Sequence, residues 1–293
     1  MASLAIKIVD YIAAFSKSKP DYDLLILNYH SIVPDGCIPS QWEVVQSEFD
    51  KQMAEIFKSG MRTIKLSDVP KIQKTVIPGT FAESLPLVCI TFDDGFEDNY
   101  TLAAGILERY SLTATFSVVS NTIQSNVLDK LSRDFQNVVK NRKLFMTPMM
   151  LRDLVRRKFE IVSHTMTHPN LNVTKTADLF QEIIESSQII DQISGSSSGA
   201  FIMSYGLEEC PAMKRRVTEV LDGNGFSVAA LGRYGYCTFS ESYTALDVPR
   251  IPIYGSDNMT TFKNKLMGKY WLVSIIYRLV KAFRVRTNYE NSN

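Results

Sequence analysis

Two polar clusters each follow an apolar run, and their residue types could support metal-dependent chemistry. The first is Thr91-Phe92-Asp93-Asp94-Gly95. Neighbouring side chains on a strand point to opposite faces, so two carboxylates can share a pocket only where the strand ends. Gly95 lets the chain turn at that point. The alternative is an ordinary Asp-Gly surface turn, which the preceding apolar run disfavours.

The second cluster is Ser163-His164-Thr165-Met166-Thr167-His168-Pro169, again directly after an apolar run. Histidines four residues apart suit chelation of one ion on a helical turn, and neutral imidazole favours zinc-like ions. A carboxylate from the aspartate pair would give three ligands and an open position for water, as in catalytic metal sites. Chance spacing is the alternative, although the chain has only three histidines.

Both clusters need a scaffold that brings strand ends together, and the hydrophobic pattern predicts one. The expected strands are residues 24–30, 62–66, 88–92, 113–119, 159–164, 200–205, 226–231 and 248–253. The expected helices are residues 43–58, 99–110, 148–158, 175–193 and 212–223. This alternation indicates an α/β protein whose parallel sheet forms a closed or nearly closed barrel, with its active site at the strand ends. The polar segment 121–142 is expected to be an inserted, mildly helical connection.

The composition is that of an ordinary globular protein. The 293 residues are 45% hydrophobic, and 32 basic against 31 acidic side chains leave a net charge of +1. A chain of this length needs no metal to fold, so a bound metal would be functional. The near-neutral charge and the lack of zinc-finger spacing or a basic recognition helix argue against nucleic-acid binding.

Cysteine usage and hydropathy favour a cytoplasmic protein. The four cysteines form no Cys-x-x-Cys pair, and Cys89 lies in an apolar run where a buried free thiol is the usual interpretation. Residues 1–20 are expected to form a short amphipathic helix without the apolar centre of a secretion signal. The sequence contains no apolar run of the roughly 18 residues that a membrane span requires.

Residues 258–293 are expected to form a basic amphipathic helix and tail after a barrel domain over 21–257. Residues 263–286 contain seven basic side chains and no acidic one. The apolar stripe of this helix would be Leu272, Ile275, Ile276, Leu279 and Phe283, with Arg278, Lys281 and Arg284 opposite. Such a helix can lie on an anionic membrane surface, and the preferred alternative is a last barrel helix with a solvated face.

Taken in order, the motifs resemble the polysaccharide deacetylases with a NodB-homology domain, carbohydrate esterase family four. Residues 91–95 are similar to their first motif and residues 163–171 to their second. The resemblance covers roughly residues 24–255. It implies a deformed (β/α)7-type barrel in a single catalytic domain, which agrees with the periodicity.

The resemblance also implies roles for individual residues. One divalent metal ion, with zinc favoured, would be bound by Asp94, His164 and His168. Asp93 would be the base that takes a proton from the attacking water, and the backbone N–H of Tyr205 would stabilise the oxyanion. Arg250 would hold Asp93 in an ion pair, and its alternative is a surface charge at a strand end.

Two departures from the family pattern bear on activity. The third motif, Phe201–Gly206, lacks the proline that many relatives have before Tyr-Gly, so its loop is expected to be looser. No histidine follows His168, although many relatives take their general acid from a late Leu-x-His motif. His30 is therefore expected to protonate the departing amine, as some members with a similar N-terminal segment are thought to do. The alternative is a structural histidine bonded to a backbone carbonyl.

The sequence thus predicts a hydrolase that removes the N-acetyl group from an acetamido sugar of a polysaccharide or a lipid-linked glycan precursor. One alternative is hydrolysis of another amide, such as a formamido sugar, by the same residues. The other is a catalytically impaired pseudoenzyme that binds sugar without turnover, which the altered third motif leaves open.

Overall fold

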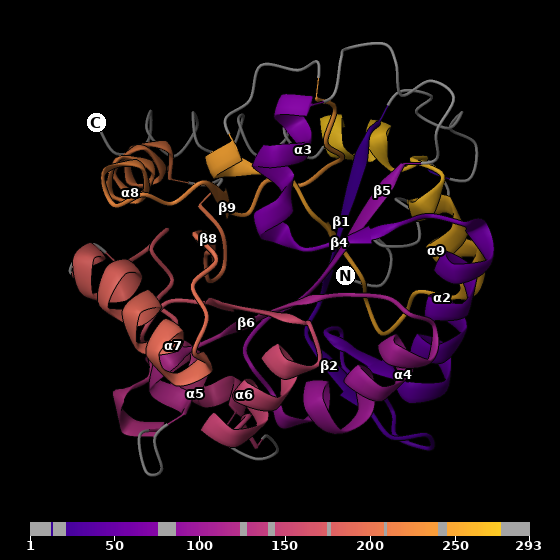
Figure 1. Cartoon of the computed structure of the whole chain (residues 1–293), viewed down its shortest axis with the longest axis horizontal. Coiled ribbons are helices and arrows are strands. Elements are labelled where there is room, and N and C mark those ends of the chain that lie inside the picture. Colours follow the sequence, from indigo (N-terminus) through magenta and orange to yellow (C-terminus); the bar gives the residue numbers. More distant parts are fainter. Residues whose placement is uncertain are drawn as a thin grey trace.

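A central parallel sheet surrounded by helices organises the chain (Figure 1). The computed structural model describes residue 13 and residues 22–75, 86–123, 128–139, 144–174, 177–207, 210–239 and 245–276. The strands of the sheet are β1 (Leu24–Tyr29), β4 (Thr63–Ile64), β5 (Leu87–Phe92), β6 (Thr115–Val118), β7 (Glu160–Ser163), β8 (Ala200–Ile202), β9 (Val228–Ala230) and β10 (Ile251–Pro252). Every stretch predicted as a strand overlaps one of these, so the predicted parallel sheet is confirmed.

The sheet curls into a deformed barrel, as predicted. Its strand order is β10-β1-β5-β6-β7-β8-β9, and β4 pairs with the beginning of β5. Beyond β9 the chain returns to the opposite edge, where Tyr234 bridges to Arg250 and Cys237 to Leu24. Because the strands are parallel, their carboxyl ends meet at one rim. The residues that follow β1, β5 and β7 are thereby brought together.

The helices cover the outside of the sheet. They are α2 (Gln46–Ser59), α3 (Val69–Thr75), α4 (Ala104–Arg109), α5 (Arg133–Val139), α6 (Pro148–Arg156), α7 (Ser186–Ser194), α8 (Pro211–Gly223) and α9 (Met259–Leu266). Short π-helical turns, Asn99–Ala103 and Phe180–Glu185, lead into α4 and α7. In α2, Phe49, Met53 and Ile56 are buried at helical spacing, and Gly60 ends the helix in the left-handed conformation.

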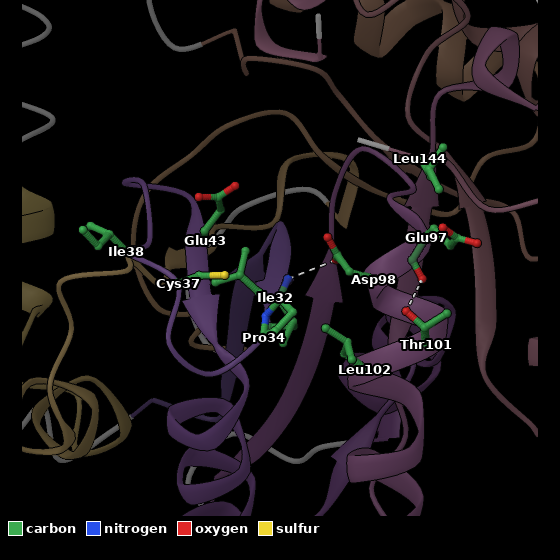
Figure 2. Close-up of a pocket in the computed structure, with 11 residues that line it drawn as sticks. Ile32, Pro34, Cys37, Ile38, Glu43, Glu97, Asp98, Thr101, Leu102 and Leu144 are labelled. Carbon is green, nitrogen blue, oxygen red and sulfur yellow. Dashed lines mark hydrogen bonds between the residues drawn. The ribbon is translucent and has the colours of Figure 1, made fainter. Parts of the chain in front are cut away.

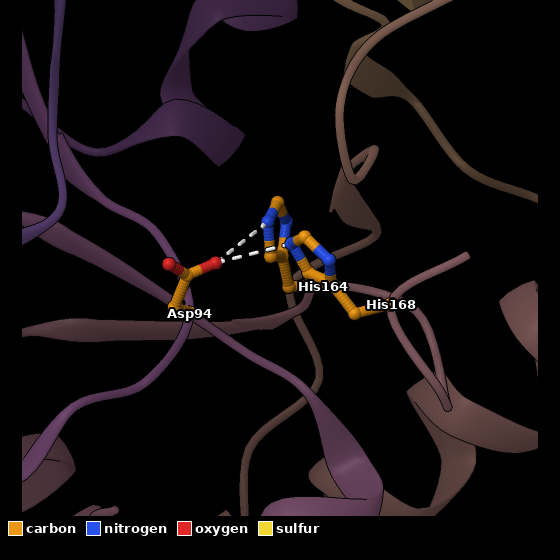
Figure 3. A group of neighbouring side chains, drawn as sticks. All are labelled: Asp94, His164 and His168. Atoms are coloured by element: carbon orange, nitrogen blue, oxygen red, sulfur yellow. Dashed lines mark ion pairs between the residues drawn. The ribbon is translucent and has the colours of Figure 1, made fainter. Parts of the chain in front are cut away.

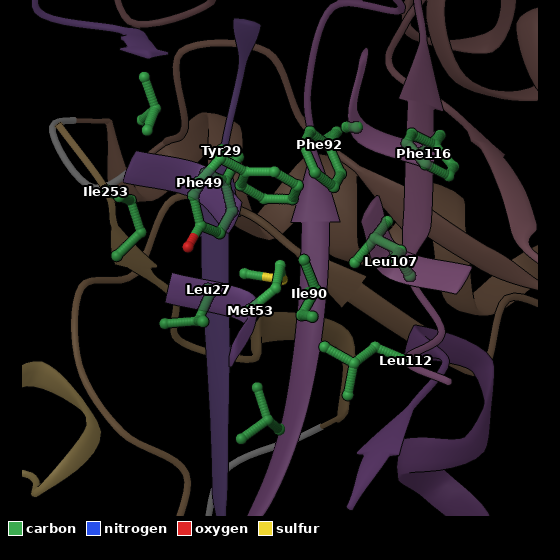
Figure 4. Packing of buried hydrophobic residues seen from close by; sticks show 14 of the residues in the cluster. Leu27, Tyr29, Phe49, Met53, Ile90, Phe92, Leu107, Leu112, Phe116 and Ile253 are labelled. Carbon is green, nitrogen blue, oxygen red and sulfur yellow. The ribbon is translucent and has the colours of Figure 1, made fainter. Parts of the chain in front are cut away.

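Side chains alternate between two cores along the strands. Leu27, Tyr29, Ile90 and Phe92 point outward and pack against residues of α2 and α4 (Figure 4). Their sequence neighbours belong to a separate cluster inside the barrel, which includes Leu24, Ile26, Leu87 and Cys89. Since the period of a strand is two residues, Thr91 and Asp93 continue the inward row of β5. The interior is therefore apolar near the strand beginnings and polar at the rim.

The structure differs from the sequence prediction at the start of the expected helix 43–58. Glu43–Val45 form a strand, β3, that pairs in parallel with β2 (Ser31–Val33), and the helix begins only at Gln46. The β-branched residues Val44 and Val45 favour a strand when a partner is present. Within its described residues, segment 121–142 contains short helical turns and α5 but no strand, as predicted.

The residues after 257 pack on the barrel as far as the structure describes them. α9 contacts α2, and the main core cluster includes Phe262, Leu266, Tyr270 and Val273. Ile276, which belongs to the expected apolar stripe, is 42% exposed. The remainder of that stripe, from residue 277 on, lies outside the described residues, as does the expected helix over 1–20 apart from Ala13. Among the helices that the structure describes, none is long and apolar enough to cross a membrane.

Candidate active site

Asp93 is buried at the rim and paired with Arg250. Arg250 donates two hydrogen bonds of 2.8 Å, one to each carboxylate oxygen, and Ser117 Oγ donates a third of 2.9 Å. Burial raises the pKa of Asp93, but the Arg250 guanidinium, together with the nearby His164 and His30, outweighs burial and lowers this pKa to about 2. The ion pair expected between these residues is present, and it keeps a buried carboxylate ionised and fixed in orientation.

Asp94, His164 and His168 converge on one point (Figure 3). Their potential ligand atoms lie within 4.8 Å of one another, and the Asp94 carboxylate is 3.5 Å from His164 Nε2 and 3.2 Å from His168 Nε2. His164 Nδ1 lies 3.0 Å from the Ile202 carbonyl oxygen, to which it can donate, leaving Nε2 free to bind a metal. One oxygen and two nitrogens in a buried cluster suit a zinc-like ion with an open coordination position.

The backbone takes an unusual conformation at this site. Four non-glycine residues there have φ between 55° and 76°, namely Asp94, Thr165, His168 and Tyr205. This left-handed region is disfavoured for side chains with a Cβ, and such outliers concentrate at functional sites. Gly95 also has positive φ, and a Cβ there would lie 2.8 Å from Val118. The sharp turn expected after Asp94 therefore admits only glycine.

The predicted oxyanion residue, Tyr205, lies next to the candidate metal ligand His168. Its ring meets that of His168 edge-on at 4.7 Å, and no described residue accepts a hydrogen bond from its backbone N–H. The loop is restrained without the missing proline, because Gly206 and Gly232 pack so closely that a Cβ on Gly206 would lie 2.6 Å from Gly232 Cα. Asn172 Nδ2 also donates to the Gly206 carbonyl at 2.9 Å.

His30 lines the same cavity as the candidate metal ligands. The carbonyl oxygen of His30 accepts a hydrogen bond of 2.7 Å from Asn99 Nδ2, and the His30 ring lies 4.5 Å from that of Trp42. Its Nδ1 is buried and has no hydrogen-bond partner among the described residues, so this nitrogen makes no structural bond to a backbone carbonyl there. Burial lowers the pKa of His30, although the nearby carboxylates of Asp94 and Asp93 oppose this effect.

A cavity of about 530 Å³ is lined by all the predicted site residues, namely His30, Asp93, Asp94, His164, His168, Tyr205 and Arg250. Several aromatic and apolar residues that the sequence analysis missed also line it, among them Trp42, Phe135, Tyr254 and Tyr270. The Phe135 ring stacks on His168 at 4.0 Å. None of these residues lies in a recognisable motif, although Phe135 comes from the segment 121–142.

Glu182 is a further residue that the sequence did not single out. It is buried, and its carboxylate accepts hydrogen bonds from the backbone N–H groups of Met166 and Thr167, both at 2.9 Å. These hydrogen bonds fix the backbone of the loop between His164 and His168. The available signal in the sequence was an acidic residue among the apolar positions of the predicted helix 175–193.

A second cavity, of about 610 Å³, lies beside β2 (Figure 2). Asp98 faces it and accepts hydrogen bonds from the Ser31 hydroxyl at 2.6 Å and the Ile32 N–H at 3.0 Å. Among the described residues that line it, no group has the arrangement of a metal site. Asp98 instead ties β2, and with it the chain next to His30, to the segment that follows Asp94.

A family model matches the part of the chain that contains most of this site. A family model described as polysaccharide deacetylase matches residues 83–228, which contain Asp93, Asp94, His164 and His168. The chain belongs to the polysaccharide deacetylase family. Other cavity residues of this family member lie outside the matched span, including His30, Trp42, Arg250 and Tyr254.

Individual relatives are distant. YxkH of Bacillus subtilis (strain 168) is 26% identical over 184 residues, 63% of this chain and 57% of that protein. The poly-beta-1,6-N-acetyl-D-glucosamine N-deacetylase of Escherichia coli (strain K12) is 20% identical over 270 residues, 85% of this chain and 39% of that protein. The chain therefore spans 57% and 39% of the lengths of these relatives.

Solved deacetylase structures share the fold. The Streptococcus pyogenes deacetylase PplD, solved in complex with acetate, superimposes with a TM-score of 0.65 and 17% identity, covering 84% of this chain and 99% of that one. At this identity the similarity concerns the fold alone, and it agrees with the deformed barrel described above.

Proposed function

We propose that this chain is a metal-dependent hydrolase that removes the N-acetyl group from an acetamido sugar of a polysaccharide or a lipid-linked glycan precursor. The observation that carries the proposal is the arrangement of Asp94, His164 and His168 beside an ionised Asp93 in one cavity. The name of the Escherichia coli relative, a deacetylase of an N-acetylglucosamine polymer, supports this substrate class.

The proposed metal ligands are Asp94, His164 and His168, and zinc is the favoured ion because two of the three donors are imidazoles. A divalent ion bound there would act as a Lewis acid on the amide carbonyl and make water more acidic. The hydrogen bond between His164 Nδ1 and the Ile202 carbonyl oxygen would orient its ring toward that ion.

The remaining residues would handle protons and charge. Asp93 accepts a proton from the attacking water, and Arg250 keeps its carboxylate ionised and aimed. The Tyr205 N–H donates a hydrogen bond to the oxyanion that forms on the carbonyl. His30 then donates a proton to the departing nitrogen, since an amine leaves readily only when protonated.

The proposal is tested by acetate release from N-acetylglucosamine oligomers, with formate release from a formamido sugar measured in parallel. We expect acetate, and we expect a strong chelator to abolish its release without unfolding the protein. Asp94→Asn should lower metal occupancy, whereas Asp93→Asn should keep the metal and lose turnover. Formate without acetate would reassign the acyl group, and equal metal loss in both variants would overturn the division of roles.

We also propose a cytoplasmic location and treat contact with an anionic membrane through residues 263–286 as an alternative role for this segment. The four cysteines of the chain are free, which suits a reducing compartment. Lys263 pairs with Glu55 at 3.2 Å and Lys265 with Asp257, so two of the segment's basic residues already have partners on the barrel. Sedimentation with anionic vesicles tests the contact, and equal recovery in the supernatant with and without lipid would exclude it.

A further inference from the structure

The two-stranded sheet β2/β3 places Trp42 against His30. In its register Ser31 lies opposite Glu43, so the residues just before them, His30 and Trp42, are neighbours. The Ser31 N–H donates to the Trp42 carbonyl at 3.2 Å, and the two rings lie 4.5 Å apart. The position of the indole relative to His30 is therefore fixed by backbone pairing.

A second aromatic ring extends this surface. Tyr254 lies 5.1 Å from the Trp42 ring. Its backbone N–H donates to Asp257 Oδ2 at 3.0 Å, and Asp257 is in turn paired with the buried ammonium group of Lys265, which lies 5.0 Å from the Tyr254 ring centre. The ion-paired Asp257 thus holds the backbone at Tyr254. The two adjacent rings form an aromatic wall, defined as Trp42 and Tyr254.

The aromatic wall lines the cavity of the metal ligands, and Trp42 is 40% exposed although it packs against two rings. We propose that the aromatic wall stacks against the apolar face of the sugar ring that carries the scissile acetamido group. The axial C–H groups of a pyranose are weakly positive and are attracted to the electron-rich face of an aromatic ring. This inference rests on the proposed function and names the substrate-ring contact that the function requires.

The wall can be examined independently of turnover because the chain has two tryptophans, Trp42 and Trp271. Trp271 does not line the cavity, so Trp271→Phe leaves Trp42 as the only indole. This zinc-loaded variant is titrated with β-1,4- and β-1,6-linked N-acetylglucosamine trimers while its fluorescence is recorded, with acetate release measured in the same samples. We expect a saturable change in fluorescence. The same titration with Asp93→Asn added gives binding without hydrolysis.

Kinetics supply the second measurement. Trp42→Ala should raise KM about tenfold, whereas Trp42→Phe should retain most of the affinity because it keeps a ring. The control is Phe57→Ala, which removes an exposed aromatic side chain of α2 that packs on Tyr110 outside the cavity and should leave KM unchanged.

The outcomes separate this inference from the proposed function. A fluorescence change without acetate release supports the wall and counts against deacetylation. Acetate release without a fluorescence change, or equal KM values for Trp42→Ala and the wild type, overturns the wall and leaves the function standing. If no trimer alters the fluorescence and none is hydrolysed, both are overturned.

Discussion

At the scale of single residues, the ion pair between Arg250 and Asp93 is expected to set how the proposed activity depends on pH. With the pKa of Asp93 held at about 2, its carboxylate is ionised throughout the neutral and weakly acidic range. Arg250→Met removes the opposing charge, so burial would then raise the pKa of Asp93. We expect kcat/KM of this variant to fall at a higher pH than that of the wild type as the solution is acidified, by about 10²–10⁴-fold once Asp93 is protonated.

The measurement is a pH profile of kcat/KM for acetate release. Arg250→Lys, which retains the charge but not the double hydrogen bond, should lie between the two. A parallel loss at every pH would show that Arg250 acts through something other than the protonation state of Asp93.

His30 is expected to matter only when the leaving group needs a proton. His30→Ala should keep its metal and fold but lose about 10²–10⁴-fold in turnover of the acetamido sugar. Hydrolysis of an aryl acetate should be nearly unaffected, because a phenolate departs without protonation. In the wild type, acetamide turnover should decline as pH rises through the pKa of His30, which burial lowers, since only the imidazolium donates. Loss below tenfold, or equal loss on both substrates, would exclude the role.

At the scale of elements, a buried acid joins β6, β7 and the turn after β4. Glu160 Oε2 accepts hydrogen bonds from the Leu66 N–H at 2.9 Å and from Thr115 Oγ1 at 2.7 Å. Burial raises the pKa of Glu160. The folded state therefore binds this proton more tightly than the unfolded state, and the resulting stabilisation is lost as pH rises through the folded pKa.

Glu160→Gln replaces the carboxyl group with an amide, which does not titrate and keeps an acceptor oxygen. We expect its free energy of unfolding, relative to the wild type, to increase between about pH 4 and pH 8 in urea titrations. Glu108→Gln is the control of opposite sign, measured below about pH 5: the hydrogen bonds from Arg157 lower the pKa of Glu108, so the free energy of unfolding of this variant, relative to the wild type, should instead increase as the pH falls. A pH-independent difference for Glu160→Gln would contradict this account.

The sequence predicted the elements whose signal is local. Eight strands and the two motifs that carry the candidate metal ligands were found because apolar runs end directly at Asp93 and His164. β2 and β3 were not found, since three-residue strands have little periodicity and are stabilised by pairing across the chain. Trp42 and Tyr254 were missed for a related reason, because their meeting beside His30 depends on that pairing and on the return of the chain after β10.

At the scale of the whole molecule, residues 258–276 are expected to be required for folding. They contribute Phe262, Leu266, Tyr270 and Val273 to the main core, and each fully buried side chain of this kind stabilises the fold by about 1.5–3 kcal/mol. Their sum is comparable with the whole stability of a typical domain.

A chain that ends after residue 257 should therefore show no cooperative thermal unfolding, whereas one that ends after residue 276 should retain it. Circular dichroism during heating provides the measurement. Cooperative melting of the shorter chain would mean that the barrel domain does end at 257.

The left-handed backbone at Asp94, Thr165, His168 and Tyr205 limits how freely this protein can drift in sequence. Residues held in such conformations each destabilise a fold by about 1 kcal/mol or more, and four of the six non-glycine residues with positive φ in the described part of the chain lie at the site. The rest of the barrel must offset that deficit, which leaves a smaller margin above the threshold for folding. Slightly destabilising substitutions in the distant core would then reduce the amount of active protein, so selection on the chemistry at the rim extends to residues that never approach the substrate.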